Sequence, residues 1–129
     1  MARRVIFDTN SLMIPGREGV DIFAEVERAL SSLPSFKVME GSLRELEFIA
    51  KSGTGKDRAA VKLVLAILKG KDIGVIPQES ESVDNAIVET VVPGDVVVTM
   101  DKNLRKRLKE KGVDTAVLRQ RKYILILEA

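Results

Sequence analysis

The sequence predicts an α/β protein with a parallel sheet and crossover helices. Short apolar runs alternate along the chain with helix-like stretches, which is typical of successive β-α-β units. Two of the apolar runs, 5–7 and 96–100, stop at an aspartate, Asp8 and Asp101 respectively. Because the carboxyl ends of parallel strands meet at one edge of the sheet, where ligands bind, these two carboxylates are expected to share one site.

The individual elements follow in a regular order. The predicted strands are 4–7, 36–39, 73–76, 95–99 and 115–118, and the predicted helices are 21–30, 42–51, 57–69, 82–91 and 102–111. Gly70 and Gly112 stand where C-terminal helix caps are favoured, and Pro93 with Gly94 predicts a turn before the fourth strand. A last apolar run, 123–127, is either a sixth strand or a surface that covers a partner subunit, because five adjacent apolar residues are seldom left in water.

The length of 129 residues fits one domain, 1–129, and the 45% hydrophobic content argues against disorder. No apolar stretch approaches the ~20 residues that cross a bilayer. Arg3 and Arg4 precede only a short apolar segment, which is unlike a signal peptide. We therefore expect a soluble cytoplasmic protein with no membrane partner.

The chain contains no His, Cys or Trp. This composition excludes imidazole acid/base catalysis, Ser-His-Asp triads, thiol nucleophiles and His/Cys zinc sites. What remains for catalysis is mainly oxygen ligands and a hard cation.

Charge is unevenly distributed, although the formal net charge is only +2. Residues 72–101 carry seven acids and no base: Asp72, Glu79, Glu81, Asp84, Glu89, Asp95 and Asp101. Residues 102–129 carry nine bases: Lys102, Arg105, Lys106, Arg107, Lys109, Lys111, Arg119, Arg121 and Lys122. This arrangement suits a metal site beside a phosphate-holding surface, and the alternative is that the basic helix is simply a solvated face.

Two further acids, Glu45 and Asp84, stand near predicted helix starts. Crossover helices begin near the carboxyl edge of the strands, so both acids can approach Asp8 and Asp101. As alternatives, Ser42 with Glu45 would form a capping box, and Asp84 would complement a helix dipole. Two carboxylates ~4 Å apart repel by about 4 kcal/mol at an effective dielectric of 20, so a cluster of acids favours a bound cation. Oxygen ligands select Mg²⁺ or Mn²⁺.

Four segments of the chain resemble, in order, the four acidic signatures of the PIN-domain ribonucleases. They are Phe7-Asp8-Thr9-Asn10-Ser11-Leu12, Glu45 in Ser-Leu-Arg-Glu-Leu, Val83-Asp84-Asn85-Ala86-Ile87 and Val98-Thr99-Met100-Asp101-Lys102-Asn103-Leu104. The resemblance implies a three-layer αβα sandwich with a central parallel sheet. The C-terminal third resembles the archaeal branch related to the rRNA-processing PIN proteins, and similar small archaeal chains are grouped with the VapC toxins.

The resemblance also implies residue roles. The four acids Asp8, Glu45, Asp84 and Asp101 would form the catalytic metal site, with Glu47 as the alternative to Glu45. Asn10 and Thr99 would support the pocket through hydrogen bonds. Asn85 stands where many members carry another acid, which bears on whether one metal binds or two. Substrate phosphates would be held by four bases of the helix at 102–111: Lys102, Arg105, Lys106 and Lys109.

The expected activity is Mg²⁺- or Mn²⁺-dependent endoribonuclease cleavage, in a toxin of a toxin-antitoxin pair or in an RNA-processing nuclease. The expected partners are RNA, a second copy of the chain in a homodimer, and an antitoxin protein if the chain is a toxin. The alternative is a non-cleaving RNA-binding or assembly module in ribosome maturation.

Two other phosphate-handling classes do not fit the sequence. Haloacid-dehalogenase-like phosphatases have a second aspartate two positions after the first, where this chain has Asn10. A P-loop is excluded because Gly55 and Lys56 are followed by Asp57 instead of Ser or Thr. A Rossmann fingerprint is also absent.

Overall fold

The protein is described by a computed structural model that covers residues 2–129. The strands are β1 (Arg4–Phe7), β2 (Ser35–Met39), β3 (Gly74–Ile76), β4 (Val96–Val98), β5 (Asp114–Arg119) and β6 (Tyr123–Leu127). The helices are α1 (Thr9–Leu12), α2 (Ile14–Glu18), α3 (Ile22–Leu30), α4 (Glu40–Ser52), α5 (Gly55–Gly70), α6 (Val83–Thr90) and α7 (Lys102–Glu110).

All six strands belong to one sheet, in the order β3-β2-β1-β4-β5-β6. The first five strands are parallel, and β6 pairs antiparallel with β5. In the centre, Phe7 lies opposite Val38 on β2 and Val98 on β4. Because the strands end in register, Asp8 and Thr99, which follow β1 and β4, emerge at the same edge of the sheet.

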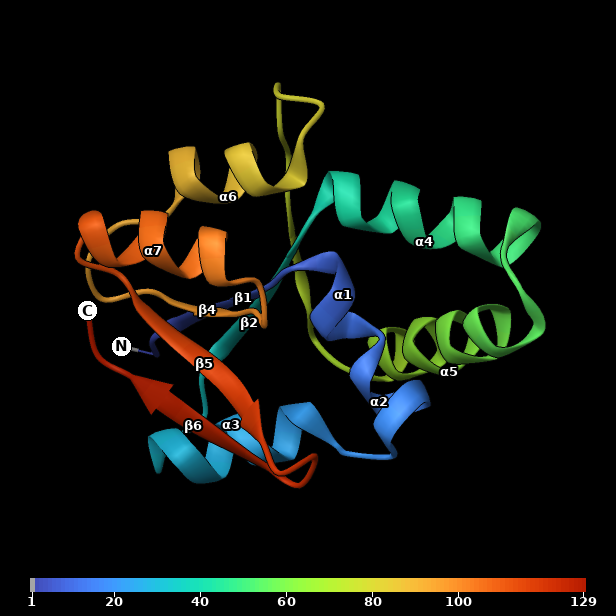
Figure 1. Ribbon diagram of the computed structural model, residues 1–129, viewed down its shortest axis with the longest axis horizontal. Coiled ribbons are helices and arrows are strands. Elements are labelled where there is room, and N and C mark those ends of the chain that lie inside the picture. The colour runs from blue at the N-terminus through green and yellow to red at the C-terminus, as the bar shows by residue number, and fades with distance from the viewer. Residues whose placement is uncertain (1) are drawn as a thin grey trace.

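Two apolar cores sandwich the sheet and confirm the predicted α/β architecture. One core includes Phe7 and Val98 and is covered by α1 to α5, and the other includes Ile6 and Val97 and is covered by α6 and α7. Figure 1 shows α6 and α7 together on one side of the strands, with α3 on the opposite side. Alternate residues of β1 and β4 therefore point to opposite cores, so these strands are apolar on both faces.

Aspartate and hydroxyl side chains cap most helices at their N-termini. Asp8 accepts the Ser11 N–H at the start of α1, and Asp101 accepts the Asn103 and Leu104 N–H groups at the start of α7. Asp21, Thr54 and Ser82 cap α3, α5 and α6 in the same way. Such caps supply acceptors for N–H groups that have no partner within the helix.

The sequence prediction missed two short helices, α1 and α2, which directly follow β1. Both are too short to display a helical period. The second one, α2, is bounded by Pro15 near its start and by the left-handed Gly19 at its end.

The run 123–127 is a sixth strand, with Ile124 buried and its N–H donating to Glu25 of α3. The sheet is therefore only mostly parallel. Within residues 2–129, no helix has the length and apolar character needed to cross a bilayer.

Candidate active site

A cavity of about 260 Å³ opens at the carboxyl edge of the sheet. All four acids singled out in the sequence line it, together with side chains from α1 and α6; the full lining is Asp8, Thr9, Asn10, Glu45, Ser82, Val83, Asp84 and Asp101. We call it the acidic cavity. The four carboxylates come from four separate segments of the chain, so only the parallel sheet and its crossover helices bring them together.

Asp8 is the most firmly held of these acids and is only 5% exposed. Its Oδ1 accepts the Ser11 N–H at 2.8 Å, and its Oδ2 accepts the Thr99 hydroxyl at 2.5 Å. The Ser11 hydroxyl in turn donates to the Val98 carbonyl at 2.9 Å. A buried carboxylate needs such donors, and they fix its orientation toward the cavity.

Thr99 connects two of the acids. Its Oγ1 donates to Asp8 and accepts the Asp101 N–H at 3.0 Å, while Asp101 itself is exposed and caps α7. The threonine is completely buried. Asp8 and Asp101 thus share one hydroxyl as a hydrogen-bond partner. Asn10 is exposed and lines the cavity, and its side chain makes no hydrogen bond to any residue between 2 and 129.

The sequence predicted that Glu45 stands in the first turn of its helix. The helix α4 begins earlier, at Glu40, so Glu45 lies beyond the first turn. The capping-box interpretation of Ser42 is wrong for the same reason: its hydroxyl is buried and lies 2.9 Å from that of Thr9. Glu45 nevertheless reaches the acidic cavity. Glu47, the alternative, lines a separate cavity with apolar side chains of α4, α5 and β3.

Gln78 replaces the missing cap of α4. Its Oε1 accepts the Gly41 N–H at 2.8 Å, and its Nε2 donates to the Ser80 carbonyl at 2.7 Å. A side chain at Gly41 would collide with Gln78, since a Cβ there would lie 2.6 Å from Nε2. This contact ties the loop before α6 to the start of α4, and no local pattern in the sequence points to it.

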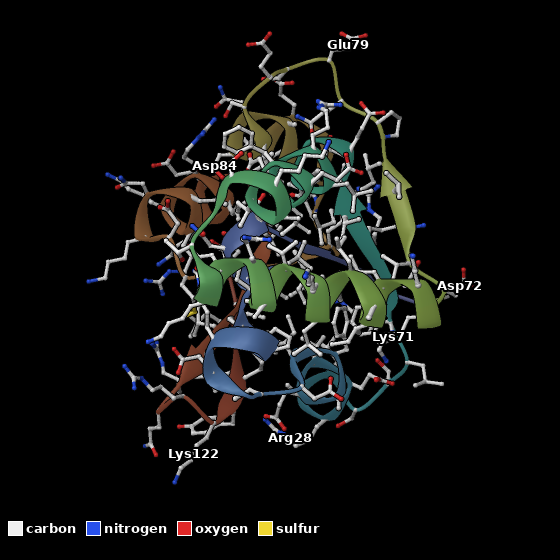
Figure 2. The ribbon with its side chains drawn as sticks, turned by 90° about the vertical axis from the view of Figure 1, so that its right-hand side faces the viewer. Arg28, Lys71, Asp72, Glu79, Asp84 and Lys122 are labelled. Carbon is white, nitrogen blue, oxygen red and sulfur yellow. The ribbon has the colours of Figure 1, made fainter. Side chains whose placement is uncertain are left out.

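Asp84 lies in the first turn of α6, after the cap made by Ser82. Burial raises the pKa of its carboxyl, and the charges of Asp8 and Asp101 raise it further, while Arg107 opposes them. Figure 2 shows Asp84 toward the same end of the molecule as Glu79, with Lys122 of the β5–β6 turn at the other end. The negative charges of Asp8 and Asp101 thus act on Asp84, as expected for clustered carboxylates.

The donor set of the acidic cavity fits a hard divalent cation, because every ionisable ligand it offers is a carboxylate. Within residues 2–129, no three acidic side chains converge tightly enough to enclose a metal by themselves. Mg²⁺ commonly keeps several waters and uses only one or two protein carboxylates, so an open site of this kind suits it better than a closed cage would.

The four bases predicted to hold substrate line a cavity of their own. A separate cavity of about 430 Å³, the basic cavity, is lined by Lys102, Arg105, Lys106, Lys109, Val113, Thr115, Leu127, Glu128 and Ala129. In the described part of the chain, the buried Nε of Arg105 has no hydrogen-bond partner. The base of α7 whose charge acts on Asp84 is Arg107, which sequence analysis did not single out.

The acidic cavity lies within a region of the chain that matches a known protein family. A family model described as a PIN like domain matches residues 5–121, and so includes every residue that lines this cavity. This chain belongs to the PIN-like domain family. The resemblance seen in its four acidic segments is thereby confirmed.

Two curated relatives of this PIN-like chain match over nearly its whole length. Ribonuclease VapC4 from Methanocaldococcus jannaschii is 31% identical over 127 residues, which cover 95% of each chain. Ribonuclease VapC9 from Archaeoglobus fulgidus is 26% identical over 124 residues, covering 96% of this chain and 89% of the relative.

Solved structures share the fold of the PIN-like chain. The PIN domain endonuclease Utp24 superposes with a TM-score of 0.80 at 21% identity, over 98% of this chain and 92% of that one. A domain of a functionally unknown protein from Methanocaldococcus jannaschii gives a TM-score of 0.54 at 18% identity, over 92% of each chain. At these identities the likeness concerns the fold alone, and it confirms the mostly parallel three-layer architecture.

Proposed function

We propose that this chain is an endoribonuclease that hydrolyses RNA phosphodiester bonds with Mg²⁺ or Mn²⁺. The observation that carries the proposal is the acidic cavity, where four carboxylates from four segments line one opening. Membership of the PIN-like family and similarity to two proteins named ribonucleases support it. We further propose that this activity serves a toxin of a toxin-antitoxin pair or an RNA-processing nuclease.

The cation would be held by the acids that line the acidic cavity, either directly or through water molecules that the cation keeps: Asp8, Glu45, Asp84 and Asp101. When bound, a divalent cation polarises the phosphate and neutralises the charge that develops during hydrolysis. It would also relieve the repulsion that raises the pKa of Asp84. Asp8 is held in place by the Ser11 N–H and the Thr99 hydroxyl, so its position does not depend on the cation. Asn10, which lines the cavity, would support the pocket through hydrogen bonds.

Substrate phosphates would contact the bases of α7: Lys102, Arg105, Lys106 and Lys109. Since Asp101 and Lys102 are adjacent, the RNA backbone could pass from the acidic cavity to the basic cavity along α7. That helix rises by 1.5 Å per residue, so Asp101 and Lys109 lie about 12 Å apart along its axis.

Cleavage of a labelled RNA, with and without EDTA, tests the proposal. The wild-type protein should cleave with Mg²⁺ or Mn²⁺ and stop with EDTA, and Asp8→Asn and Asp101→Asn should not cleave. Glu45→Gln and Glu47→Gln form a matched pair on one helix, of which only the first should lose activity. Cleavage that persists in Asp8→Asn and Asp101→Asn would refute the assignment. RNA binding without cleavage by the wild type would favour a non-cleaving assembly module.

We also propose a homodimer and, for a toxin, an antitoxin protein partner. Tyr123 and Leu125 on the edge strand β6 are 37% and 42% exposed, which supports an apolar surface for a second copy. Sedimentation that finds only monomer at micromolar concentration would refute the dimer. A short reading frame directly upstream of the coding sequence would favour the toxin over the processing nuclease.

A further inference from the structure

Phe48 differs from the other phenylalanines of this chain. Phe7, Phe23 and Phe36 form one buried cluster, with ring centroids 4.9 to 5.6 Å apart. Phe48, on α4, is 69% exposed. The fold gains little from an aromatic ring in water, so this side chain is available for a ligand.

The position of Phe48 links it to the acidic cavity. A shallow cavity of about 380 Å³ is lined by Arg44, Glu45, Phe48 and Ile49. Glu45 lines this Phe48 cavity on one side and the acidic cavity on the other. Because residues three apart on a helix are neighbours, the ring lies one turn from the Glu45 carboxylate on the same face. The Phe48 cavity therefore adjoins the acidic cavity at Glu45.

We propose that Phe48 is a stacking surface for one unpaired RNA base, next to the phosphate held at the acidic cavity. This inference rests on the proposed ribonuclease function. A nucleotide carries a phosphate and a flat aromatic base on one unit, so a single ligand can fill both adjoining cavities. Ile49 extends the apolar surface, and Arg44, which pairs with Glu40 at 3.0 Å, adds a cation at its rim. Stacking of this kind tolerates any base, because every base has a π-face.

Tryptophan fluorescence tests the inference directly, since the natural chain contains no Trp. In Phe48→Trp combined with Asp101→Asn, which should prevent cleavage while Mg²⁺ is present, a short single-stranded oligoribonucleotide should quench the emission, whereas inorganic phosphate should not. Leu63→Trp is the matched control, because Leu63 is an exposed apolar residue of the neighbouring helix α5 and is 44% exposed. Its emission should stay constant. Emission from Phe48→Trp that is unchanged up to millimolar oligoribonucleotide would overturn the inference.

A second measurement compares Phe48→Ala with Phe48→Tyr. Removing the ring that stacks on one base should raise the KM for single-stranded RNA by about 5- to 150-fold in Phe48→Ala, with kcat little changed, and the tyrosine variant should restore it. Quenching in the tryptophan variant, together with no cleavage by the wild-type protein in Mg²⁺ or Mn²⁺, would refute the nuclease and leave the stacking surface in place. Cleavage with the same KM in wild type and Phe48→Ala would refute the stacking surface and leave the nuclease in place. It would point to a protein segment as the occupant of this surface.

Discussion

The hydroxyl of Thr99 donates to Oδ2 of Asp8 at 2.5 Å, across a sequence separation of 91 residues. The hydroxyl oxygen of Thr99 also accepts the N–H of Asp101. One buried side chain therefore sets the positions of two of the four acids, because β1 and β4 are neighbours and end in register.

Replacing Thr99 by Val should destabilise the protein, because it leaves the buried Asp8 carboxylate and the Asp101 N–H without this partner. We expect a decrease of about 1.5–3 kcal/mol in the free energy of unfolding, measured by urea denaturation. RNA cleavage should fall as well. Thr99→Ser keeps the hydroxyl and should stay close to wild type in both measurements. A valine variant as stable as the wild type would contradict the role assigned to this hydrogen bond.

Asp84 should make stability depend on pH. Its pKa is raised in the folded protein by burial and by Asp8 and Asp101, so the folded state retains the proton longer than the unfolded state. Its contribution to stability is therefore present below the unfolded pKa, near 3.8, and declines as pH rises toward the folded pKa. At neutral pH with EDTA, Asp84→Asn should raise the melting temperature, and in a separate assay with Mg²⁺ it should abolish cleavage. The difference in melting temperature from wild type should vanish at acidic pH, and an unchanged difference would contradict this account.

Gly16 should be intolerant of any side chain, because a Cβ there would lie 2.4 Å from the Ala60 Cα and 2.6 Å from its Cβ. Gly16→Ala would force α2 away from α5 and should cost about 1–3 kcal/mol, measured by thermal or urea unfolding. Gly55→Ala is the matched control. Nothing lies within 4 Å of a Cβ at Gly55, so that variant should be neutral or slightly stabilising. Equal stabilities of the two variants would contradict the packing described.

The bases of the basic cavity should control how RNA binding depends on salt. Arg105→Ala or Lys106→Ala should each weaken binding and reduce the slope of log K against log[salt] by about 0.7 for every phosphate of a single strand that is no longer neutralised. Lys62→Ala, an exposed base of α5, should leave the slope unchanged. Binding isotherms at several salt concentrations measure this effect. Equal slopes in all variants would mean that α7 is only a solvated face.

The fold class and most of the elements follow from the amino-acid sequence alone. Runs such as 5–7 and 96–98 are apolar at every position because both faces of the strand are buried, and this local pattern needs no knowledge of the partners. The run 123–127 left two possibilities, since a terminal apolar strand looks the same whether it pairs within the chain or covers a second subunit. The short helices α1 and α2 were missed because one helical turn carries no detectable period.

The way in which the site is held together, in contrast, depends on contacts between distant segments. Ser42 followed by Glu45 looks like a cap in the sequence, yet Gln78 caps α4 from 37 residues away and the Ser42 hydroxyl meets Thr9. In the sequence, the bases of α7 cannot be assigned to different faces of the helix. In the structure, the charge of Arg107 acts on Asp84, whereas four other bases of α7 line the basic cavity together with residues of β5 and β6. Hydrogen bonding and charge act between groups that are close in space, and a linear sequence records which groups are present without recording which of them meet.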